Sequence, residues 1–261
     1  MKNICFFILS LFFIQCNAQS PKNSSAKSGV AVADLKKTIV CKSEKLTYHF
    51  PDIRAKNENN FFNQEIIAGY VEASGISMGK IKTPEQLLQN IVKSRTEACK
   101  KGDNYSGLNT VSFEIGSNNG KVLSLTMHYE ILAGNLTIEE KYYNFDIVNK
   151  KVLTVDEVFS KDKIPNLIHR INKELKEKLE EYNKESKELE QQEIVDGLLA
   201  NSSAIFTKEQ LESFKILEKG IEFKIDYGVP RGTLPLDNDV FMSYEELKGD
   251  LNEKINSLLR Q

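Results

Sequence analysis

The chain has 261 residues, of which 40% are hydrophobic and 28% are charged, and its formal net charge is -2 at pH 7. This length suits one large domain or two small ones, since about 100–200 residues per domain is usual. The balanced charge gives no reason to expect a nucleic-acid partner, because nucleic-acid-binding proteins normally carry a basic patch or stripe.

The N-terminus has the layout of a secretory signal peptide. Lys2 supplies a short positive region, and residues 4–14 form an apolar run that only Ser10 interrupts. This run is too short to cross a bilayer, which needs about 20 apolar residues. We therefore predict an exported protein with a signal peptide over residues 1–18 and a flexible, polar tether over residues 19–36.

Two processing routes fit this N-terminus. Cleavage between Ala18 and Gln19 would release a soluble secreted protein. Alternatively, Cys16 would be the lipidated first residue of a bacterial lipoprotein, and the tether would then separate the folded part from the membrane. We favour the lipoprotein, located in the periplasm or the outer cell envelope, with membrane contact only through its N-terminal lipid.

Two of the four cysteines, Cys5 and Cys16, lie in or beside the signal peptide, which leaves Cys41 and Cys99 for the mature chain. In an oxidising compartment such an isolated pair can form a disulfide. Two buried free thiols are an equally open alternative. A zinc site is not expected, because the nearest histidine, His49, stands alone, and no cofactor is predicted.

The first part of the mature chain predicts two strands followed by two helices. Residues 38–40 and 45–50 are the strands, and Pro51 ends the second. Large apolar side chains recur at helical spacing over residues 61–70. The second helix begins at Thr83, which is followed by a proline at the first helical position and a glutamine that could complete a capping box.

The segment 121–159 carries the most regular pattern of the chain. Apolar side chains at odd positions from 123 to 131 alternate with polar ones, and residues 143–147 repeat the pattern. A strand at 110–115 precedes the turn sequence Asn118-Asn119-Gly120, which favours a hairpin. We therefore predict an antiparallel β-meander with one apolar face packed by helices and one polar face in solvent.

The second half of the chain is predicted to be mainly helical. Apolar side chains at helical spacing over residues 164–179 indicate a long amphipathic helix, and the charged run 173–193 is interpreted as its solvated continuation. The remaining expected elements are short helices at 195–199 and 207–214, a hairpin over 214–217 and 221–225, a strand at 240–242 and a C-terminal helix over 244–258.

These elements together predict an α+β fold over residues 37–261. Its parts are an antiparallel β-meander packed on one face by helices, a long amphipathic helix and a C-terminal helix. The domain could divide into subregions 37–150 and 151–261.

The sequence shows no signature of catalysis, such as a nucleophile elbow, a phosphate loop or a dinucleotide fingerprint. His128 lies on the polar face of its strand beside Glu130, where an acid–base pair is conceivable, but we favour a solvated strand face. Tyr142 and Tyr227 could line a ligand groove, although packing is the favoured interpretation. These four residues are the candidate ligand-binding set, and no catalytic or metal-binding residue is predicted.

Several stretches resemble an extracytoplasmic domain of unknown function that is found in many bacteria. They are YYNFD (142–146), VLTVDEVF (152–159), FKI (214–216) with GIEF (220–223), and SYEEL (243–247). This domain occurs in RsiV-type lysozyme-sensing anti-sigma factors and in PdaC-type peptidoglycan deacetylases. The resemblance covers residues 46–259, and it implies an envelope sensor or binding domain whose partner is an envelope protein such as a lysozyme, or a peptidoglycan fragment.

The expected function is therefore that of a non-enzymatic cell-envelope protein that binds a protein or a cell-wall component. Two alternatives stay open. One is a hydrolase of cell-wall glycan or peptide that uses His128 and nearby carboxylates, and the other is a purely structural lipoprotein.

Overall fold

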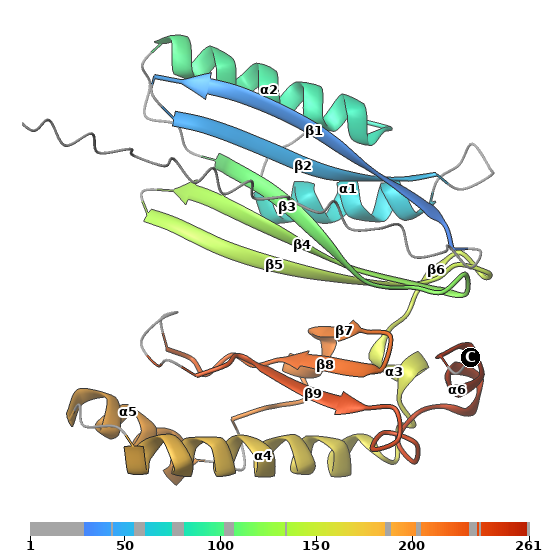
Figure 1. Cartoon of the computed structure of the whole chain (residues 1–261), viewed down its shortest axis with the longest axis vertical. Coiled ribbons are helices and arrows are strands. Elements are labelled where there is room, and N and C mark those ends of the chain that lie inside the picture. Colours follow the sequence, from blue (N-terminus) through green and yellow to red (C-terminus); the bar gives the residue numbers. More distant parts are fainter. Residues whose placement is uncertain are drawn as a thin grey trace, which may run out of the picture.

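The computed structural model describes residues 29–42, 44–54, 61–74, 81–101, 107–133, 135–185, 189–201, 205–229, 234 and 236–259. The predicted signal peptide, with Cys16, and most of the predicted tether lie outside these residues. The described chain forms two β-sheets with helices against each (Figure 1), so the predicted α+β class is confirmed.

The larger sheet has six strands in the order of the sequence. They are β1 (Ala31–Cys41), β2 (Glu44–Arg54), β3 (Gly107–Asn118), β4 (Val122–Ala133), β5 (Asn135–Asp146) and β6 (Lys151–Val152). All neighbours are antiparallel except β2 and β3, which run parallel and pair around Tyr48 and Val111. The predicted meander is thus confirmed for β3 to β6, and Gly120 in its first turn has a positive φ of 84°.

Strand β1 begins at Ala31, inside the segment that was predicted to be tether. It pairs with β2 along its whole length, from Ala31 opposite Arg54 to Cys41 opposite Glu44. The prediction that Pro51 ends the second strand is wrong, because Pro51 lies within β2 opposite Asp34. A proline is tolerated there since β2 has separated from β3 at this point, so its missing N–H removes no bond on that side.

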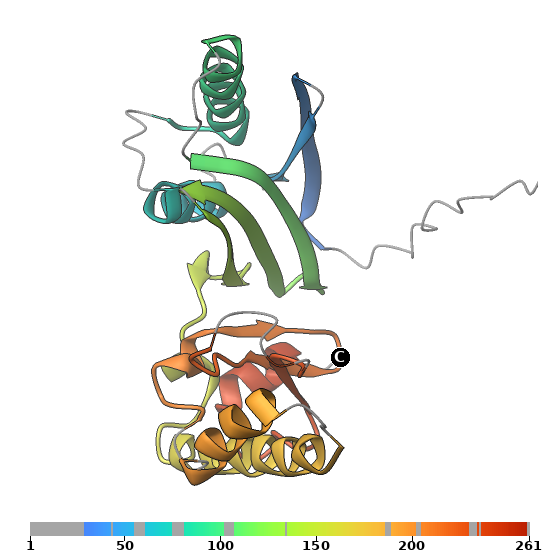
Figure 2. The ribbon, with the colours of Figure 1, turned by 90° about the vertical axis from the view of Figure 1, so that its left-hand side faces the viewer.

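Helices α1 (Phe61–Ser74) and α2 (Pro84–Lys101) cover the apolar face of the large sheet. Figure 2 shows both helices on the same side of the curved sheet. The Thr83 hydroxyl caps α2 by accepting a bond from the Gln86 N–H at 3.2 Å, while the Gln86 side chain reaches the Lys82 N–H. A disulfide joins Cys41 at the end of β1 to Cys99 in the last turn of α2, with the two Cα atoms 5.6 Å apart. We call this unit, up to Val152, the N-terminal lobe.

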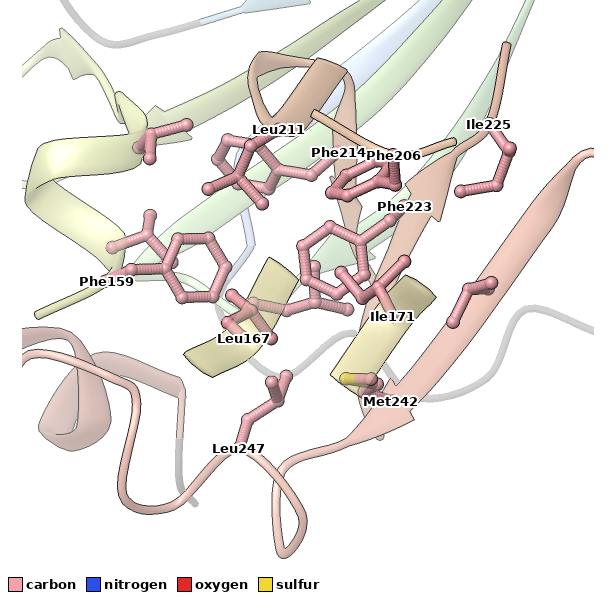
Figure 3. Close-up of a cluster of buried hydrophobic side chains, with 14 of the residues drawn as sticks. Phe159, Leu167, Ile171, Phe206, Leu211, Phe214, Phe223, Ile225, Met242 and Leu247 are labelled. Atoms are coloured by element: carbon pink, nitrogen blue, oxygen red, sulfur yellow. The ribbon is translucent and has the colours of Figure 1, made fainter. Parts of the chain in front are cut away.

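The C-terminal lobe, from Leu153 onward, is built on a small antiparallel sheet of β7 (Phe214–Ile216), β8 (Gly220–Lys224) and β9 (Asp239–Ser243). This sheet lies between the large sheet and the long helix α4 (Ile164–Glu185), as Figure 1 shows. The core between the small sheet and α4 is rich in aromatic rings (Figure 3), including Phe159, Phe206, Phe214 and Phe223. The remaining elements are α3 (Val155–Val158), α5 (Leu189–Ala200), the 3-10 helix η1 (Gln210–Glu212) and α6 (Glu253–Leu259).

Three helix predictions in this lobe need correction. The charged run does not continue α4 as one helix, because α4 ends at Glu185 and α5 starts separately at Leu189. Residues 207–214 form turns and the short η1 in place of a helix. The single helix expected over 244–258 is reduced to α6, since Asp250 and Asn252 bond to the backbone of Ser160 and Val158 and hold the chain extended at Leu251.

Candidate binding site

The two lobes meet through polar side chains of β4 and β5 that contact the edge strand β7. Asn144 Nδ2 donates to the carbonyl oxygen of Phe214 at 2.8 Å, and the Ile216 N–H donates to both Asn144 Oδ1 and Ser124 Oγ at 3.1 Å. These side chains are buried, so the prediction that the whole polar face of the meander is solvated is wrong at this end. The polar side chains therefore provide hydrogen-bonding partners for backbone groups of β7, an edge strand that has no further strand on this side.

His128 lies farther along the same face, between two glutamates. Its Nδ1 is 3.5 Å from Glu140 Oε1 on β5, and its Nε2 is 3.8 Å from Glu114 Oε1 on β3. Both glutamates also meet lysines of the small sheet: Lys215 pairs with Glu114, and Lys224 Nζ lies 3.4 Å from Glu140 Oε2. We call these five residues the inter-sheet ion network.

The four candidate ligand-binding residues do not form one site. Tyr142 joins the network, because its hydroxyl donates to Glu140 Oε2 at 2.9 Å; burial raises its pKa, and the Glu140 charge adds to the effect. Glu130 instead accepts a bond from Asn109 Nδ2 at 3.3 Å. Tyr227 packs in the core of the C-terminal lobe and donates to the Asp237 carbonyl oxygen, and burial raises its pKa to about 12.

The strand register adds a residue that sequence reasoning missed. Ser112 on β3 and Glu140 on β5 are the direct cross-strand partners of His128, so a hydroxyl, an imidazole and a carboxylate stand in one row. The ring nitrogens of His128, however, face Glu140 and Glu114 rather than Ser112. Counting residues outward from the Asn119-Gly120 turn does not place Ser112 opposite His128, because the register between β3 and β4 shifts between Ile115 and Ser117.

Glu222 on β8 faces the same inter-sheet region. Its raised pKa predicts how the stability of the fold depends on pH. Burial raises the pKa of Glu222, and the Asp239 carboxylate raises it further, against the opposing effect of Lys215. A carboxyl whose folded pKa exceeds its unfolded value destabilises the fold once ionised, so stability is higher below the unfolded pKa of about 4.3 and falls as pH rises above it.

Glu222→Gln should therefore raise the free energy of unfolding at pH 7, by less than about 1 kcal/mol because solvent screens a half-exposed charge. The gain should disappear at a pH below the unfolded pKa. Urea unfolding at both pH values checks this, with Glu218→Gln in the exposed β7–β8 turn as the matched control. A variant that is less stable than wild type at pH 7 would contradict the prediction.

A hollow of about 550 Å³ lies where β6, α3 and α6 meet, within the usual size range of ligand pockets. Part of its lining is apolar and comes from Leu153, Ile255 and Leu258. The other lining residues are polar or charged: Asp146, Lys151, Glu157, Ser160, Asn252, Glu253 and Lys254.

Asn252 holds the wall of this hollow together. Its Nδ2 donates to the carbonyl oxygens of Asp156, Glu157 and Phe159 at 2.9–3.1 Å, and its Oδ1 accepts from the Ser160 hydroxyl at 3.2 Å. One amide therefore binds the short α3 and the segment after it to the start of α6. This fixes the shape of the hollow from two distant parts of the chain.

Most acidic groups of the hollow already have partners. Asp146 is buried, and its two oxygens accept bonds from the backbone N–H and the side chain of Asn149. Burial would raise the pKa of Glu157, but hydrogen bonds from Lys151 and the Thr154 N–H outweigh it and lower the pKa. Glu253 and Lys254 are exposed, and neither has an ion-pair partner among the described residues.

Two further features of the described residues bear on function. Within these ranges, no three His, Cys, Asp or Glu side chains gather closely enough to hold a metal ion. None of the helices in the described part of the chain has the length and apolar character of a membrane span.

No protein-family model and no curated protein matches the chain significantly. The solved structures that are similar to it include two of the DUF3298 family. A member of the DUF3298 family from Bacteroides fragilis NCTC 9343 has a TM-score of 0.51 at 15% identity, covering 90% of this chain and 99% of that chain. A DUF3298 family protein from Pseudomonas aeruginosa PAO1 has a TM-score of 0.55 at 8% identity, covering 88% and 97%. At such identities the comparison shows a shared fold, that of a bacterial domain family of unknown function.

Proposed function

We propose that this chain is an exported, non-enzymatic protein of the bacterial cell envelope, of the RsiV and PdaC type, that binds an envelope protein or a cell-wall component. The signal-like N-terminus supports export. The Cys41–Cys99 disulfide also supports it, because disulfides persist mainly in oxidising compartments. The shared fold with DUF3298 proteins is consistent with such a role.

The observation that carries the binding role is the hollow beside α6. Three of its lining residues are apolar and seven are polar or charged, so it offers both a surface for an aliphatic group and groups that can form hydrogen bonds. Its buried carboxylate Asp146 and the partly buried Glu157 are held by fixed hydrogen bonds, and none of its lining residues is a histidine or cysteine. Such a lining suits recognition better than proton transfer or nucleophilic attack.

The row of Ser112, His128 and Glu140 favours a second candidate, a cell-wall hydrolase. The three residue types are those of a nucleophile, a base and an orienting acid. We rank it lower because Lys224 pairs with Glu140 and because His128 faces Glu114 on its other side.

Sedimentation with purified peptidoglycan tests the proposal. We expect mature wild-type protein to co-sediment, or to capture an added lysozyme, without releasing soluble cell-wall fragments. Failure of both binding assays would contradict the proposal. Fragment release that is lost in Ser112→Ala and in His128→Ala would instead establish the hydrolase.

A labelling experiment tests the proposed lipid anchor separately. Labelled palmitate should be incorporated into the wild-type protein and not into Cys16→Ser. Incorporation that survives this substitution would show that Cys16 is not the attachment site.

A further inference from the structure

We infer that the hollow between β6, α3 and α6 binds the carboxylate end of a short peptide and accommodates an aliphatic side chain on its apolar floor. This inference rests on the proposed function, and it names the part of a cell-wall component or protein partner that the site would take.

The floor of the hollow is aliphatic. Leu153 and Ile255 are each 3% exposed, and Leu258 packs partly buried against the same core. Burying an aliphatic side chain against such a surface stabilises a complex because apolar area is removed from water. A small aliphatic group such as the methyl of an alanine would fit without displacing any polar partner.

The unused hydrogen-bonding groups of the hollow are the ammonium donors of two lysines and the carboxylate acceptors of Glu253. An ammonium group has three N–H donors, and Lys151 uses one of them on Glu157. Lys254 has no ion-pair partner in the described part of the chain. Asn252 already donates to three carbonyl oxygens, and Asp146 is already bonded on both oxygens. Two lysines with free donors are suited to a carboxylate, because charge-assisted bonds of this kind are short and strong.

The net charge of the lining is -1, so it favours a ligand that carries both a carboxylate and a cationic group over a simple anion. Its two lysines stand against three carboxylates, those of Asp146, Glu157 and Glu253. A doubly charged phosphate would meet repulsion from these carboxylates, whereas a peptide brings one carboxylate together with amide or ammonium donors. The carboxylate of Glu253 has no ion-pair partner among the described residues. It can therefore accept a hydrogen bond from an amide or ammonium N–H of the peptide.

Titration of the 15N-labelled mature protein with D-Ala-D-Ala, followed by NMR, tests this inference. We expect saturable shifts in the backbone amides of residues 151–153 and 252–258. The C-terminal amide of the same dipeptide should bind at least about tenfold more weakly, because it lacks the charge. Lys254→Gln should weaken binding by a similar factor, while Lys248→Gln, an exposed lysine outside the hollow, should leave it unchanged.

Other outcomes would overturn the inference. These are the absence of saturable shifts at millimolar dipeptide, equal binding of the acid and the amide, or equal effects of the two lysine substitutions. Tighter binding of inorganic phosphate than of the dipeptide would also overturn it, in favour of a general anion site. Peptidoglycan co-sedimentation without dipeptide binding would reject this inference and leave the proposed function in place, whereas failure of both assays would reject both.

Discussion

Replacing Cys41 and Cys99 together with alanine should lower the free energy of unfolding by about 4 kcal/mol. The disulfide closes a loop with a sequence separation of 58 residues, which includes β2, α1 and nearly all of α2. Cross-linking so long a loop restricts the unfolded chain strongly. It also ties β1, an edge strand of the large sheet, to the helix that packs on it.

Urea unfolding of the double variant checks this value. Reduction of the wild-type protein should shift its unfolding midpoint to that of the variant, and reduction of the variant should change nothing. If oxidised wild type and variant unfold at the same urea concentration, the disulfide does not stabilise the fold as expected.

Replacing Asn144 with alanine should cost about 3 kcal/mol, which is the second largest effect we expect. The substitution removes a partner from two buried backbone groups, the Phe214 carbonyl and the Ile216 N–H, and an unsatisfied buried group costs about 1–3 kcal/mol. Ser124 would still accept a bond from the Ile216 N–H, so the loss at that group is partial.

Two measurements check the Asn144 prediction. The urea midpoint should fall, and amide hydrogen exchange in β7 should become faster while exchange in β1 and β2 is unchanged. Asn183→Ala is the matched control, because it removes a single exposed bond to Asp196 and should cost less than about 0.5 kcal/mol. Equal effects of the two substitutions would show that Asn144 does not hold the lobes together.

The sequence predicted those elements whose pattern is complete within a short segment. The alternation from Leu123 to Ile131 is sufficient to define β4, and the turn at Gly120 then places β3 beside it. The apolar stripe of α4 likewise predicts the helix and its buried face. In both cases the interactions that determine the secondary structure lie within one element or between two neighbouring ones.

Features that depend on distant residues could not be predicted in this way. From the sequence, Ser124 and Asn144 are predicted to be solvated, because their hydrogen-bonding partners in β7 come 92 and 70 residues later. The apolar positions after Ser243 fit a helix, but the extended segment at Leu251 is fixed by pairing with Phe159. Strand register pairs Glu140 with His128, whereas Glu114 stands opposite Thr126, and Lys215 and Lys224 come from a different sheet.

The amide of Asn252 also has a consequence for the order in which the protein is made. It bonds to carbonyl groups that were synthesised more than 90 residues earlier, at Asp156, Glu157 and Phe159. A growing chain already contains all the elements of the N-terminal lobe while Asn252 is still missing. The proposed peptide site is therefore complete only after residues 252–258 have been synthesised, so a chain stalled before that point would contain Cys41 and Cys99 but lack the site.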